Sequence, residues 1–186
     1  FINTFITTGF EDGTVHWGDL NNDEYLDIVL GGTSGSSSIF RVFQPDLSDG
    51  SFDFQNYGTI DVEDASIDLA DYNADGYLDM AMAGNDNGTR VVRIFPNDAN
   101  GLFGFGTPIS LPTGIDQGEV KWGDYDNDGL PDLLITGSSS SGRVTKLYRN
   151  APAGTFTEVA TSLTAMDDGA SAAWGDYDQD NKLDII

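Results

Sequence analysis

The sequence predicts an all-β protein, a β-propeller built from four-stranded antiparallel blades. A similar unit occurs four times, at spacings of 52, 53 and 52 residues, with its first aspartate at Asp19, Asp71, Asp124 and Asp176. Each unit contains four short apolar runs between turn-forming residues, and no stretch has a convincing helical apolar period. Four antiparallel strands repeated at about fifty residues are typical of propeller blades, whereas a sandwich would not repeat its loops so regularly.

The four runs of each unit are expected to be strands because they are rich in β-branched and aromatic residues. The first run ends in Trp-Gly or its equivalent, at residues 15–18, 67–70, 120–123 and 172–175. The second run covers residues 28–30, 80–83 and 133–135, and a turn rich in Gly, Ser and Asn follows it. The third run covers residues 38–43, 90–95 and 144–149, and the fourth covers 52–58, 102–108 and 156–162.

The two residues immediately before each first aspartate are expected to pack one blade against the next. The bulky position is expected to be buried between blades rather than to bind a ligand, and it holds Trp17, Leu69, Trp122 and Trp174. The following small position permits close approach by a neighbouring backbone, and it holds Gly18, Ala70, Gly123 and Gly175.

The chain is expected to be one propeller segment, 1–186, of about 3.5 blades. Its repeats are 1–51 (a leading fourth strand, FINTFITT, plus a blade), 52–102, 103–155 and an incomplete 156–186. A closed ring of about seven blades would need about 365 residues at this period. We therefore expect either a fragment of a longer propeller chain or copies that associate, since an open arc leaves blade faces uncovered.

An Asp-rich loop follows the first run of each unit, and these loops are the candidate sites. We call them loop one (19–27), loop two (71–79), loop three (124–132) and loop four (176–184), numbered from position 1 at the first aspartate. Positions 1, 3, 5 and 9 are always Asp or Asn, and they hold fourteen of the 31 acidic residues. Carboxylates packed so closely repel one another unless a cation lies between them.

The donor types indicate which cation. Oxygen ligands without His or Cys select Ca²⁺ or Mg²⁺ over zinc or copper, and the flexible coordination of calcium suits a loop best. Position 7 would offer its backbone carbonyl, so up to four Ca²⁺ are expected. The predicted ligands are Asp19, Asn21, Asp23, Tyr25 and Asp27; Asp71, Asn73, Asp75, Tyr77 and Asp79; Asp124, Asp126, Asp128, Leu130 and Asp132; and Asp176, Asp178, Asp180, Lys182 and Asp184. The alternative is that these are solvated acidic turns without a metal.

The loops are not EF-hands, and they are not equivalent. An EF-hand needs a glutamate at position 12 and flanking helices, but position 12 is apolar in loops one to three and the flanks are strand-like. Position 6 is expected to need a left-handed backbone, which suits Gly76, Gly129 and Asn181 better than Glu24. We therefore rank loop three first, loops two and four next, and loop one last.

The motif D-x-[DN]-x-D-G-x-x-D, following W-G-D-Y or its equivalent between two strands, resembles the FG-GAP or VCBS repeat of integrin-α-like propellers. The resemblance extends over nearly the whole chain. It implies a propeller with calcium in the loop between strands one and two, and a secreted or cell-surface protein. It also implies an adhesion or recognition function. Some relatives bind sugars or form part of carbohydrate-active enzymes.

The composition of the chain argues against some classes of partner and against disulfide bonds. A net charge of −23 argues against binding of nucleic acid or anionic membranes, and no apolar run is long enough for membrane insertion. Cysteine is absent, so a metal rather than a disulfide would stabilise a secreted form.

No enzyme is expected. With one histidine, His16, a Ser-His-Asp triad has only one possible centre, and a glycosidase carboxylate pair stays open. The links into the first strands are acidic (Glu11, Asp12, Glu63, Asp64, Asp116, Glu119, Asp167 and Asp168). These links lie opposite the loops, on the face where a protein or glycan partner would bind, although simple turn capping explains them as well. The functions that stay open are a recognition or adhesion module, a lectin-like part of an enzyme, and a structural spacer.

Overall fold

The computed structural model describes residues 11–35, 37–55, 60, 62–98, 108–166, 169 and 171–186. These residues form thirteen β-strands and no helix, which confirms the all-β prediction. Within the described ranges, no helix is therefore long and apolar enough to cross a membrane. The expected leading strand at residues 1–8 lies outside the described residues.

The first blade is a four-stranded antiparallel sheet in chain order. It consists of β1 (Glu11–Gly18), β2 (Asp27–Ser34), β3 (Ser37–Asp46) and β4 (Ser51–Gln55). The sheet boundary therefore lies after β4, beyond the expected repeat boundary at residue 51. β2 also extends through Gly31 and Gly32, which the sequence placed in a turn.

The second and third blades share one strand. Their strands are β5 (Glu63–Ala70), β6 (Asp79–Asp86), β7 (Thr89–Phe95), β8 (Ile109–Gly123), β9 (Asp132–Ser139), β10 (Gly142–Ala151) and β11 (Thr155–Val159). β8 pairs with β7 at Ile109, Ser110 and Ile115, and with β9 from Asp116 to Gly123, so the two blades form a seven-stranded sheet. The sequence predicted separate strands at 102–108 and 120–123. Residues 102–107 lie outside the described part, and the described pairing with β7 begins at Ile109.

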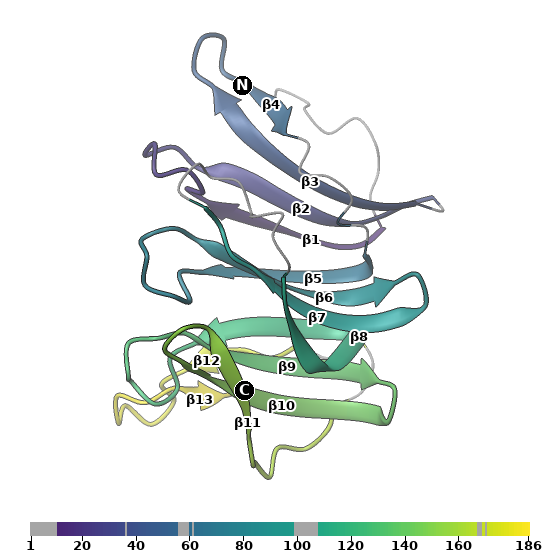
Figure 1. Cartoon of the computed structure of the whole chain (residues 1–186), viewed down its shortest axis with the longest axis vertical. Coiled ribbons are helices and arrows are strands. Elements are labelled where there is room, and N and C mark those ends of the chain that lie inside the picture. The colour runs from purple at the N-terminus through teal and green to yellow at the C-terminus, as the bar shows by residue number, and fades with distance from the viewer. Residues whose placement is uncertain are drawn as a thin grey trace.

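The blades are stacked one after another as an open, incomplete ring. Figure 1 shows β1–β4, then β5–β7, then β9–β11 along the long axis of the molecule. The last pair, β12 (Trp174–Gly175) and β13 (Asp184–Ile185), begins a fourth blade. These features confirm propeller-type blades.

The core lies between consecutive blades. One cluster joins Val29 and Val42 of the first blade to Ile67 and Met80 of the second, and another joins blades two and three. Glycine permits this packing, because a Cβ on Gly31 would lie 2.8 Å from Cδ1 of Ile67. Strand glycines therefore serve blade-to-blade contact as well as turns.

The tryptophans differ in burial according to what covers them. Trp122 is 9% exposed, and its ring is stacked on Tyr72 of the preceding blade with centroids 6.1 Å apart. Trp17 is 57% exposed, so the prediction that it is buried was wrong. Its blade is the first of the described part, and no preceding sheet covers that face there.

The glycines after Trp17 and Trp122 do admit a close neighbour, but the neighbour is a side chain. A Cβ on Gly123 would lie 2.7 Å from Nε1 of Trp174. The expectation of a neighbouring backbone at this position was therefore wrong, because the indole of the next blade occupies the space.

Candidate metal centres

All twenty predicted ligands lie in four separate hairpin loops at one end of the blades. Each loop leaves its first strand at position 1 and returns at position 9, which is paired with the residue before position 1. Gly18 is paired with Asp27 and Gly123 with Asp132, and the same pairing recurs in the other two loops. The strands therefore fix both ends of each loop and leave the residues between them to turn inward.

Each loop is closed by the same set of side-chain to backbone hydrogen bonds. In loop two, the carboxylate of Asp71 accepts from the N–H of Asp75 at 3.0 Å and of Gly76 at 2.8 Å. The carboxylate of Asp75 accepts from the N–H of Tyr77 at 3.0 Å. The corresponding bonds are present in the other three loops. Positions 1 and 5 are therefore drawn toward the same interior.

Two positions of every loop have a left-handed backbone. Position 6 has φ of 72° at Glu24, 92° at Gly76, 90° at Gly129 and 65° at Asn181. This confirms the left-handed backbone predicted there, and it places Glu24 in a conformation that costs more for a residue with a Cβ. Position 4 is also left-handed, with φ between 57° and 63° in all four loops. The left-handed backbone at position 4 was not predicted from the sequence, although Asn at two of its four places was a signal for it.

The carboxylates come close enough to share a cation in two loops. Oxygens of Asp124, Asp126 and Asp128 all lie within 4.8 Å of one another, as do oxygens of Asp176, Asp178 and Asp184. Such a donor set, made only of oxygens, fits a hard divalent cation.

The first two loops have asparagine at position 3, and its amide lies against the position 5 carboxylate. Asn21 donates from Nδ2 to Asp23 at 2.9 Å, and Asn73 donates to Asp75 at 2.9 Å. Three carboxylates at positions 1, 5 and 9 remain in these loops, so the ligand positions carry one carboxylate fewer than in loops three and four.

The aspartate at position 9 forms the base of each loop. Asp27, Asp79 and Asp132 are fully buried, and each accepts the N–H of position 2 of its own loop. Burial raises the pKa of Asp27 to about 6, that of Asp79 to about 7 and that of Asp132 to about 6. Among the position 9 residues, Asp184 lies with positions 1 and 3 of its loop in a group that could hold a metal, whereas Asp132 lies outside the group in loop three.

A buried asparagine ties position 9 to the preceding blade. The N–H of Asn97 donates to Asp79 at 2.7 Å, and its Nδ2 donates to the carbonyls of Leu20 and Leu78. Asn150 makes the same three bonds one blade later. The first blade has Pro45 at this place, which lacks an N–H, and Oδ1 of Asp27 has no hydrogen-bond partner among the described residues.

An arginine that was not predicted as part of the site lies on loop three. Arg149 of β10 donates from Nε to Asp126 at 2.5 Å and from Nη2 to Asp128 at 2.9 Å. The residues at the same place in the first two blades are Gln44 and Pro96, so this cation belongs to the third blade. Lys182 similarly lies 3.2 Å from Asp180 within loop four.

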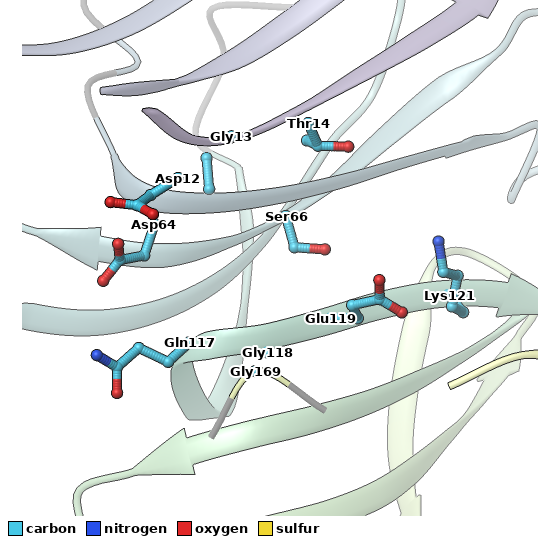
Figure 2. Close-up of a pocket in the computed structure, with 11 residues that line it drawn as sticks. Asp12, Gly13, Thr14, Asp64, Ser66, Gln117, Gly118, Glu119, Lys121 and Gly169 are labelled. Atoms are coloured by element: carbon cyan, nitrogen blue, oxygen red, sulfur yellow. The ribbon is translucent and has the colours of Figure 1, made fainter. Parts of the chain in front are cut away.

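A second polar feature lies at the other end of the blades. A cavity of about 580 Å³ is lined by the starts of β1 and β5 and by the second half of β8, with residues that include Asp12, Asp64 and Glu119. Figure 2 shows Asp12 and Asp64 together at one side, and Glu119 with Lys121 at the other. Burial first, and then the charge of Asp12, raises the pKa of Asp64. Asp12 lies six positions before Gly18, so the side of the cavity at Asp12 lies roughly 20 Å from loop one.

Two of the acidic residues in the links into the first strands accept hydrogen bonds from residues distant in the sequence. Asp116 accepts a hydrogen bond from Arg90 at 2.8 Å, and Glu119 accepts from Ser171 and from the N–H of Ala172. These are contacts to other strands and other blades rather than turn caps. The predicted link residues Asp167 and Asp168 lie outside the described residues.

The single histidine lies between the first two blades. Nδ1 of His16 is 3.9 Å from Oδ1 of Asp68, and burial lowers the pKa of the imidazole. Asp68 also accepts a hydrogen bond from the N–H of Trp122 at 2.7 Å, so its carboxylate takes part in the contact between β5 and β8.

Comparison with known proteins gives one family. The model of the FG-GAP-like repeat matches the chain three times, over residues 19–82, 71–135 and 124–186. Each match begins at the first aspartate of a loop and runs through the next loop to the strand that follows it. No curated protein matches the chain.

Proposed function

Because the chain belongs to the FG-GAP-like repeat family, we propose that it is a calcium-stabilised, non-enzymatic recognition or adhesion module of a secreted or cell-surface protein. The observation that carries this proposal is the common construction of the four loops. In each of them, the carboxylates at positions 1 and 5 are held inward by backbone N–H groups.

Calcium would serve the fold rather than a reaction. Bound Ca²⁺ supplies two positive charges to a loop whose carboxylates otherwise repel one another. Positions 1, 3 and 5 and the carbonyl of position 7 would hold it, with position 9 at the base of the loop. Each loop joins two paired strands of one blade, so neutralising the loop stabilises that hairpin.

The polar cavity opposite the loops supports a partner site on that face. Its carboxylates, the amide of Gln117 and the amine of Lys121 could exchange hydrogen bonds with a protein or a glycan. A sugar-binding function, alone or as part of a carbohydrate-active enzyme, is the second candidate for the same reason. Neither nucleic acid nor a membrane interior is proposed as a partner, given the net charge of −23.

The first blade supports a further partner, namely another blade. Val15 is 54% exposed and Trp17 is 57% exposed, whereas their equivalents Val120 and Trp122 are buried against the preceding blade. We propose that more propeller chain or a second copy covers this face, since an apolar sheet face is costly to leave in water.

Calorimetric titration with Ca²⁺ tests the proposal. We expect up to four sites, with dissociation constants of about 10⁻⁴ to 10⁻³ M, as in other extracellular modules. Asp128→Ala should remove a site of higher affinity than the one removed by Asp23→Ala, because loop one has Glu24 at its left-handed position. Failure to bind calcium at millimolar concentration would refute the proposal, and a greater loss from Asp23→Ala would refute the ranking of the loops.

A further inference from the structure

Two exposed asparagines join loops of neighbouring blades directly. Asn22, at position 4 of loop one, donates from Nδ2 to the carbonyl of Gly76, at position 6 of loop two, over 2.8 Å. Asn127, at position 4 of loop three, makes the same bond to the carbonyl of Asn181, at position 6 of loop four, over 2.9 Å. The same two positions are therefore linked in both pairs, although the pairs lie more than one hundred residues apart.

Each bond ends on a peptide group at the centre of the receiving loop. In loop two this is the peptide that joins Gly76 to Tyr77. Its carbonyl accepts from Asn22, and its N–H donates to the carboxylate of Asp75. In loop four, the corresponding N–H belongs to Lys182 and donates to Asp180. Asn22 and Asn127 therefore restrain a peptide that is already bonded to a proposed calcium ligand and that precedes the proposed carbonyl ligand at position 7.

The residues on either side of the donor asparagine are fixed by hydrogen bonds within its own loop. Asn22 lies between positions 3 and 5, and the N–H of Asp23 donates to both Asp19 and Asn21. Its φ of 57° is one that asparagine tolerates better than most residues. Any cation that fixes positions 3 and 5 of loop one would therefore also fix the amide that reaches loop two.

The link is missing between loops two and three. Position 4 of loop two is Ala74, which has the same left-handed backbone, with φ of 58°, but no side-chain amide. Loops two and three are connected instead through buried Asn150, which bonds to the carbonyls of Tyr72 and Pro131. Loops one and two have both kinds of connection, since Asn97 bonds to Leu20 and Leu78.

Resting on the calcium-binding function proposed above, we infer that Asn22 and Asn127 are positioning residues that couple calcium binding between neighbouring blades. Calcium in loop one raises the affinity of loop two, and calcium in loop three raises that of loop four. The coupling between loops two and three is weaker because Ala74 provides no bond. By linkage, the effect is reciprocal within each pair.

The test follows each loop separately by NMR during a calcium titration of the 186-residue chain. The amide signals of Gly76 and Gly129 report on loops two and three, because each N–H donates to the position 1 carboxylate of its loop. Asn22→Ala should raise the calcium midpoint at Gly76 by about two- to tenfold, the range of one net hydrogen bond, and leave Gly129 unchanged. Asp23→Ala should raise the midpoint at Gly76 similarly, and the double variant should shift it by less than the product of the two effects.

A gain-of-link variant gives the stronger test. Ala74→Asn places an amide where Asn22 and Asn127 have one, and it should lower the calcium midpoint at Gly129. Gln179→Ala is the control, since it changes the same position in loop four, away from both reporters. Unchanged midpoints at Gly76 in Asn22→Ala and at Gly129 in Ala74→Asn, with calcium still bound, would overturn the coupling alone. No calcium-dependent shift at either glycine would overturn the coupling and the proposed function together.

Discussion

Arg149 places a permanent positive charge on the loop that the sequence ranks as the best calcium site. Its guanidinium bonds to Asp126 and Asp128, two of the proposed ligands of loop three. A cation entering loop three would therefore meet a tethered competitor that loops one and two do not have at this place. The affinity of loop three thus depends on a residue 21 positions beyond Asp128, as well as on its own carboxylates.

We predict that Arg149→Ala raises the calcium affinity of loop three. The gain should be small, about fivefold at most, because water screens an exposed ion pair and holding two side chains in one geometry costs entropy. The midpoint of the Gly129 amide signal measures it. Arg93→Ala is the control, since Arg93 pairs with Asp86 outside the loops and carries the same charge. An equal rise in both variants would show that net charge, rather than the contact with loop three, is responsible.

At the scale of the strands, small residues decide how closely one blade lies on the next. Gly123 and Gly175 occupy the same place in successive blades, but their surroundings differ. A Cβ on Gly123 would meet the indole of Trp174 at 2.7 Å, whereas a Cβ on Gly175 would have its nearest neighbour, Cδ1 of Ile186, at 3.9 Å. The two positions therefore form a matched pair for measuring the cost of overpacking between blades.

We predict that Gly123→Ala lowers the free energy of unfolding by about 1 to 3 kcal/mol, the usual cost of forcing a methyl group into a packed interface. Gly175→Ala should change it by less than about 0.5 kcal/mol. Urea denaturation followed by tryptophan fluorescence measures both. Equal losses would mean that Trp174 moves away without cost and that the indole does not set the spacing.

The sequence was sufficient to predict features that recur at the same position of each repeat. The loops, the left-handed backbone at position 6 and the order of strands in the first blade all follow from local residue types. It was not sufficient where a residue depends on what lies beside it. Trp17 and Trp122 share the local pattern Val-x-Trp-Gly-Asp, yet Tyr72 covers the ring of Trp122 whereas Trp17 is exposed. Likewise, Arg149 reaches loop three only because β10 pairs with β9.

For the whole molecule, charge is the dominant property. The chain carries a net charge of −23, and fifteen of its 31 acidic residues lie in the four loops. Four bound Ca²⁺ would bring the charge to about −15 and place every added charge where repulsion is greatest. Stability should therefore depend on calcium more steeply than on salt, because monovalent ions screen without occupying a defined position.

We predict that chelating calcium lowers the melting temperature clearly. At about 1 mM Ca²⁺, a site with a dissociation constant of about 10⁻⁴ to 10⁻³ M contributes roughly 0.4 to 1.4 kcal/mol. Four such sites contribute roughly 1.6 to 5.7 kcal/mol, against about 5 to 15 kcal/mol for a typical domain. Differential scanning calorimetry with and without chelator measures the change, at constant ionic strength. A melting curve that does not move would show that the loops are stable without a metal.

The strand shared by the second and third blades has a consequence for how the protein opens. Because β8 pairs with β7 on one side and with β9 on the other, neither blade can detach without breaking the edge of its neighbour. Among the described residues, no strand is shared between the first and second blades, which meet through side chains and a few loop hydrogen bonds. The second and third blades should therefore open as one cooperative unit, and the first should open at a lower free energy. In amide hydrogen exchange, β5–β11 would share one level of protection, and β1–β4 would exchange sooner.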